Sequence, residues 1–164
     1  MSKVSEKTLG SAVRKTYDMG LAEKESVLDN VYQEQPNLLA SVLVLQKFGV
    51  SLEKMDVLLN ILITLHLAFK ESGCFVPKIT EHHLERQLIL FTSVVKFSEG
   101  TGEENIRNSI GQYISSHREN VLFAYVVKEL EKANMFNISN DGEKNAVLSG
   151  INLVNCLASA ESQA

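Results

Sequence analysis

The sequence predicts an all-α protein, a compact bundle of about eight helices in a single domain over residues 1–164. Apolar residues recur at helical spacing along most of the chain. Helix-capping residues and glycines divide these periodic stretches at short intervals. No stretch has the sustained alternation with β-branched residues that is typical of strands. These three observations together favour a helical bundle with short connections.

Two helices are expected at the start of the chain, at about 3–17 and 22–34. The first has Leu9 and Val13 on its inward face, and the turn residues Asp18-Met19-Gly20 end it. The second carries an apolar face that includes Val31.

The next two helices have clearer boundaries. Pro36 fits the first turn of a third helix, where its missing N–H costs nothing. That helix is expected to end at Gly49 in the left-handed conformation. Ser51 then caps a fourth helix over 52–71, which Gly73 stops.

Four further helices are expected in the second half of the chain, each opened by a capping residue or a capping box. They lie at about 81–97 after Thr80, from the box Thr101–Glu104 onwards, from the box Ser116–Glu119 to about Asn134, and at about 142–159 after Asn140 or Asp141. The last residues, 160–164, are expected to fray.

The fourth and eighth helices are similar in sequence. At an offset of 90 they share seven identities over residues 53–69, beginning with the Glu-Lys pairs at 53 and 143. The helices before them align at an offset of 83, where Asn37-Leu38-Leu39 meets Asn120-Val121-Leu122. Two amphipathic helices can align through shared periodicity alone, but the preserved order of four helices favours a duplication of a four-helix unit, 3–72 and 80–159.

Charge and cysteine content limit the possible functions. The formal net charge is −4, and the longest basic run is the pair Arg14-Lys15, so no nucleic-acid partner is expected. The two cysteines have no CxxC spacing, and the amino terminus has no apolar run, which favours the cytoplasm. The longest apolar stretch, Val57–Phe69, is shorter than the ~20 residues that span a bilayer, so no membrane is expected.

His66 lies in this most apolar stretch, with Asn60 and Thr64 on the same expected helix. A histidine in such a place is a candidate base or ligand-binding group, and these three residues are the candidate ligand site. The alternative, which the apolar setting favours, is a core histidine bonded to a neighbouring backbone carbonyl.

Glu81, His82 and Glu85 are the densest group of metal-capable side chains, and helical spacing allows them to share a face. A metal site needs three or four ligands with orienting partners, whereas this His-x-x-Glu pattern occurs once, at a helix start. A solvated first turn is therefore the favoured interpretation. His117 lies within a predicted capping box, and local hydrogen bonding accounts for it.

The usual phosphate-binding, nucleotide-binding, esterase and metalloprotease motifs are not found, so neither a cofactor nor enzymatic activity is expected. The favoured function is a helical protein-interaction module, an adaptor or regulator that associates with a protein partner or with itself as a homodimer. One alternative is a bundle that binds a small ligand or a metal. The other is a DNA-binding regulator with a degenerate helix-turn-helix at 38–65, although its second helix is too apolar to read bases.

Overall fold

The computed structural model describes residues 3–95 and 103–162. Within these residues the chain forms α-helices and short 3-10 helices and no strand, so the predicted all-α bundle is confirmed. The elements, in order, are α1 (Glu6–Asp18), α2 (Leu21–Glu34), α3 (Pro36–Leu43), η1 (Val44–Phe48), α4 (Leu52–Glu71), α5 (Glu81–Val94), α6 (Glu103–Ser116), α7 (Asn120–Lys132), α8 (Asp141–Ala158) and η2 (Ala160–Ser162). None of the described helices is both long enough and apolar enough to cross a membrane.

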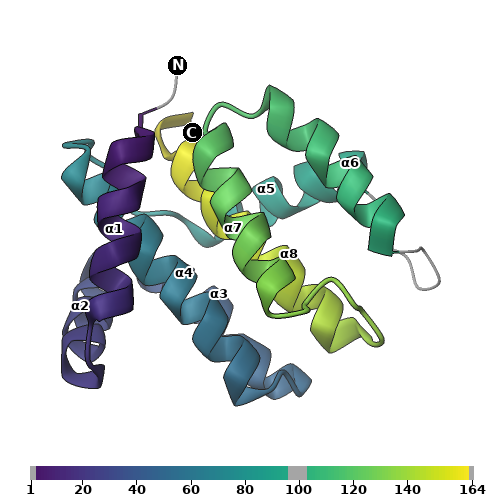
Figure 1. The fold of residues 1–164 in the computed structure, drawn as a ribbon, viewed down its shortest axis with the longest axis horizontal. Coiled ribbons are helices and arrows are strands. Elements are labelled where there is room, and N and C mark those ends of the chain that lie inside the picture. The colour runs from purple at the N-terminus through teal and green to yellow at the C-terminus, as the bar shows by residue number, and fades with distance from the viewer. Residues whose placement is uncertain (1–2, 96–102, 163–164) are drawn as a thin grey trace.

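Helices α4 and α8 form the centre of the bundle and pack against each other. Every residue of α8 from Gly150 to Ala158 is buried, and α4 buries a continuous run from Ile61 to His66. A β-carbon added at Gly150 would lie 3.0 Å from Leu58 Cδ2, so the glycine lets the two helices approach closely. The peripheral helices α2 and α6 lie at opposite ends of the molecule (Figure 1).

The packing of the two halves corresponds in several respects. Helix α1 packs on α4 as α5 packs on α8, and α3 contacts α4 as α7 contacts α8. The contacts between the halves also correspond, because α3 touches α8 and α7 touches α4. A duplicated four-helix unit would produce this pattern, and the duplication itself stays a prediction.

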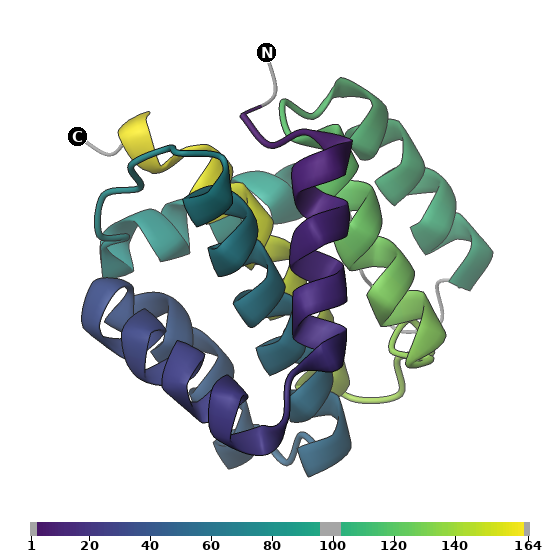
Figure 2. The same cartoon turned by 60° about the vertical axis from the view of Figure 1, so that its left-hand side comes forward.

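The amino-terminal segment is held on the start of α7. The buried Glu119 carboxylate accepts hydrogen bonds from the backbone N–H groups of Lys3 (2.9 Å) and Val4 (3.1 Å). Lys3 also forms an ion pair with Glu161 of η2. Both termini therefore lie at the same end of the molecule, as Figure 2 shows.

The capping box predicted at Ser116–Glu119 is wrong. Ser116 is the last residue of α6 and its hydroxyl donates back to the Tyr113 carbonyl, while α7 begins at Asn120 without a side-chain cap. The cause is a tertiary contact. The Glu119 carboxylate, which would close the box, instead accepts a hydrogen bond from the backbone of the amino-terminal segment.

The other helix boundaries lie closer to their predicted positions. The predicted third helix is interrupted after Leu43, and its last turn is the 3-10 helix η1, which ends as predicted at a left-handed Gly49 (φ 79°). Residues 160–162, expected to fray, form η2, and Ala160 is buried. The box at Thr101 and the expected end of the fifth helix near Phe97 lie outside the described residues.

Candidate functional site

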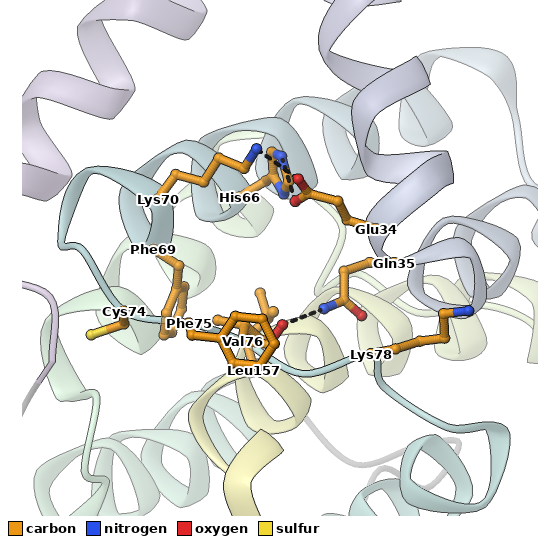
Figure 3. Close-up of a pocket in the computed structure, with 10 residues that line it drawn as sticks. All are labelled: Glu34, Gln35, His66, Phe69, Lys70, Cys74, Phe75, Val76, Lys78 and Leu157. Carbon is orange, nitrogen blue, oxygen red and sulfur yellow. Dashed lines mark hydrogen bonds and ion pairs between the residues drawn. The ribbon is translucent and has the colours of Figure 1, made fainter.

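A cavity of about 350 Å³ lies beside His66 and is here called the His66 pocket. It forms where the ends of α2, α4 and α8 meet the connection 72–79. Figure 3 shows Lys70, His66 and Glu34 grouped at one edge, with Phe75 and Val76 at the opposite edge. The buried Gln35 shapes the second edge, since its amide donates to the Pro77 carbonyl (3.0 Å) and accepts from the Ile79 N–H (2.8 Å).

The polar edge of this pocket is a network between α2 and α4. Lys70 donates to Glu34 Oε1 (2.8 Å) and to Asn30 Oδ1 (3.0 Å). His66 Nε2 lies 3.3 Å from the same Asn30 oxygen, so the neutral ring carries its proton on Nε2. Burial lowers the pKa of His66, and the neighbouring Lys70 lowers it further, while Glu34 opposes both. The imidazole is therefore held neutral and can donate, but it is a poor acceptor of a proton.

The other two members of the predicted ligand site lie elsewhere. Thr64 is fully buried and its hydroxyl lies 2.9 Å from the Thr16 hydroxyl of α1, on a different face of α4 from His66. Asn60 borders a separate shallow cavity beside Tyr125 of α7. His66 thus forms a site with residues of α2 and of the 72–79 connection, and not with Asn60 and Thr64.

The metal candidates Glu81, His82 and Glu85 are all exposed on the first turn of α5. In the described ranges no three histidine, cysteine or acidic side chains are placed to hold a metal ion. The helix-turn-helix alternative at 38–65 corresponds to α3, η1 and α4. Its second helix is the buried centre of the bundle and has little free surface to insert into a DNA groove.

A second concave site, here called the α5 groove, lies between η1, α5 and α8 and has a volume of about 330 Å³. Its walls are apolar and are formed by Val44, Phe48, Leu84, Leu88 and Leu148. Phe48 is 57% exposed, so the groove continues onto an open apolar surface.

The charges of the α5 groove are acidic. Glu81 and Glu85 line it, and the described lining residues include neither lysine nor arginine. Asn152 also borders the groove and donates to the Leu84 carbonyl (3.0 Å), which holds α5 against α8. The two carboxylates favour an occupant that brings positive charge.

Helix α8 holds two further histidines through its polar residues. His117 Nδ1 accepts from the Glu119 N–H (2.9 Å), so its proton is on Nε2, which donates to Asn155 Oδ1 (2.9 Å). His83 Nε2 lies 2.9 Å from the Ser159 hydroxyl and pins the start of α5 to the end of α8. Burial is the main cause that lowers the pKa of each of these two rings. The Cys156 thiol nearby is inert, because burial raises its pKa to about 12.

We expect the protein to lose stability on acidification below about pH 6.5, because desolvation lowers the pKa of the buried His66 and His83 and of the half-buried His117. The pKa of each is lowered from 6.5 in the folded state, so the unfolded chain binds more protons as the pH falls through this value. Urea unfolding at a series of pH values measures the effect. His117→Gln should reduce the pH dependence, whereas His82→Gln is the control at an exposed position. An unchanged pH dependence in His117→Gln would contradict this assignment.

Most residues of these two sites were not indicated by the sequence. Asn30 and Glu34 are four apart on α2, as His66 and Lys70 are on α4, so each pair shares a helix face. The sequence therefore indicates that each pair lies on one face of its own helix. It does not indicate that these faces of α2 and α4 contact each other. Phe75, Lys78 and the walls of the α5 groove carried no comparable pattern.

Comparison of the chain with protein-family models, with curated proteins and with solved structures gives no match.

Proposed function

We propose that the protein is a non-enzymatic interaction module whose α5 groove holds a basic amphipathic helix of a partner protein. The observation that carries this proposal is the open apolar wall of the groove, where Val44 and Phe48 of η1 are 40% and 57% exposed. Leu84 and Leu88 of α5 also line the groove. Exposed apolar surface beside a groove is typical of a site where another protein docks.

The charges favour a partner over a second copy of this chain. Glu81 and Glu85 border the groove, so an occupant with lysine or arginine beside its apolar face gains complementary contacts. An isologous homodimer would instead bring the same two carboxylates toward their own copies if the groove met itself. The predicted homodimer is therefore the second candidate, and light scattering tests it.

The cellular setting is part of the proposal. Both cysteines are free thiols, and the more exposed of them, Cys74, lies in the 72–79 connection. This supports a reducing compartment, so we place the interaction in the cytoplasm.

The test uses a labelled amphipathic peptide with leucines at i, i+4 and i+7 and flanking lysines, read by fluorescence polarisation. We expect binding that weakens as salt screens the charges. The double variant Val44→Ser/Phe48→Ser should weaken binding by at least about tenfold, since it removes two apolar walls of the site. The reversal Glu81→Lys/Glu85→Lys should transfer the preference to a glutamate-flanked peptide.

Phe75→Ser is the matched control, because Phe75 is also an exposed phenylalanine but lies on the 72–79 connection. Equal damage by Phe75→Ser, or a peptide preference that ignores the charge reversal, would contradict the proposal. A dimer that excludes the peptide and that Val44→Ser/Phe48→Ser dissociates would assign the groove to a second copy.

A further inference from the structure

The side of the α5 groove that belongs to α8 is largely polar. Asn145, Ser149 and Asn152 of α8 all line the groove. Their spacing of four and then three residues places them on one face of the helix. The walls from η1 and α5 carry apolar side chains such as Phe48 and Leu88. The groove therefore offers neutral hydrogen-bonding groups on its α8 side, in addition to the two carboxylates on its α5 side.

This polar stretch of α8 lies between the contact of α8 with η1 and its contact with α5. At one end, a β-carbon added at Gly142 would lie 2.5 Å from the Phe48 carbonyl oxygen. At the other end, Asn152 donates to the Leu84 carbonyl (3.0 Å). At a rise of about 1.5 Å per residue, the helix extends roughly 15 Å between these two contacts. The α8 side of the groove is thus about three helical turns long.

Asn145 and Ser149 are the polar residues of this stretch whose side chains remain available. Both are half-buried, and within residues 3–95 and 103–162 neither side chain has a hydrogen-bond partner. An asparagine amide can donate two hydrogen bonds and accept two. An apolar occupant would remove water from these groups and return no hydrogen bond. An occupant with a polar group opposite them would therefore bind more tightly than an apolar one.

We propose that the partner helix carries a glutamine or asparagine opposite Asn145 and Ser149, and that these two residues select it. This inference rests on the proposed function, and it adds a polar position to the apolar and basic faces of the partner. Two side-chain amides can exchange hydrogen bonds, because each has N–H donors and a carbonyl acceptor. A site built to form hydrogen bonds discriminates strongly against an occupant that lacks the matching group. The α8 side is therefore the side of the groove that determines specificity.

A scan of the lysine-flanked peptide tests this contact by fluorescence polarisation. Each residue of one heptad is replaced in turn by glutamine and by methionine, which has a similar length but no amide. At the position that faces α8 we expect glutamine to bind about fivefold more tightly than methionine, the effect of one or two net hydrogen bonds. At the other positions that face the groove, methionine should bind more tightly.

Variants of the protein locate the contact. Asn145→Leu should abolish the preference for glutamine and favour methionine at the same position, because it makes this side apolar. Ser149→Ala should reduce the preference. Asn108→Leu is the matched control, since Asn108 is an exposed asparagine of α6 that does not line the groove, and it should change no affinity. Circular dichroism checks that each variant keeps its helices.

The possible outcomes separate this inference from the proposed function. If no peptide of the scan binds, both are overturned. If peptides bind but methionine equals or exceeds glutamine at every position, the amide contact alone is overturned, and the basic amphipathic helix remains the occupant. A glutamine preference that is the same in Asn145→Leu as in Asn108→Leu would also overturn the inference, because the contact would then lie elsewhere.

Discussion

Replacement of Phe123 by alanine is expected to lower the free energy of unfolding by about 3–5 kcal/mol, the cost of deleting a large buried aromatic side chain. Phe123 of α7 is fully buried and touches three other rings. Its ring centroid lies 4.9 Å from that of His117, 5.2 Å from that of Tyr113 and 6.3 Å from that of Phe91. The substitution therefore opens a cavity among α5, α6 and α7 that these packed rings cannot easily fill.

Urea denaturation followed by circular dichroism measures this change. Domains of this kind have a total stability of about 5–15 kcal/mol, so Phe123→Ala should unfold at much lower urea. Phe75→Ala is the matched control, since it removes an identical side chain that is mostly exposed, and it should cost little. A cost below about 1 kcal/mol for Phe123→Ala, within the range of ordinary surface changes, would show that the ring cluster does not stabilise the fold.

The helices could be predicted because residues close to each helix end determine where that helix begins or ends. Ser51, Thr80 and Asn140 each accept a hydrogen bond from a backbone N–H three residues later, as their positions before periodic segments indicated. Gly49 takes the left-handed conformation that the end of a helix requires. These signals operate within one turn of helix, so no knowledge of the fold is needed to read them.

Prediction failed where a distant segment competes with a local pattern. Glu119 stands at the position of a capping-box residue, yet its carboxylate binds the backbone at Lys3 and Val4, more than a hundred residues earlier in the chain. The adjacent His117, attributed to local bonding, indeed accepts from the Glu119 N–H but also donates to Asn155 of α8. The sequence pattern of a capping box is therefore present, but Glu119 makes a long-range contact with the amino-terminal segment instead of closing the box.

The partners of His66 also could not be predicted from local sequence. His66 lies in the most apolar helix, as the sequence indicates, and it is 9% exposed. The sequence offers Asn60 and Thr64 of the same helix as its neighbours, whereas in the structure its partners are Asn30 and Glu34 of α2. Residues two or six apart do not share a helix face, so helical spacing alone could not join His66 to these neighbours.

Replacement of Gly142 by alanine is expected to destabilise the fold by about 1–3 kcal/mol, as overpacking does, and to distort the α5 groove. A β-carbon at this position would lie 2.5 Å from the Phe48 carbonyl oxygen and 3.2 Å from Asn140 Oδ1. The first atom belongs to the backbone of η1 and cannot rotate away. Relief of the clash must therefore shift η1, which carries Val44 and Phe48 on one wall of the groove.

Thermal unfolding and the binding of the lysine-flanked peptide measure the two effects in one variant. Gly10→Ala is the control, because nothing lies within 4 Å of the added carbon in α1, and there alanine should stabilise the helix by about 0.5–1 kcal/mol. Peptide affinity should fall in Gly142→Ala, while the far-ultraviolet circular dichroism of the helices should persist. Loss of both together would mean that the substitution unfolds the bundle. Retention of full peptide affinity despite a shifted η1 would mean that the peptide does not lie against Val44 and Phe48.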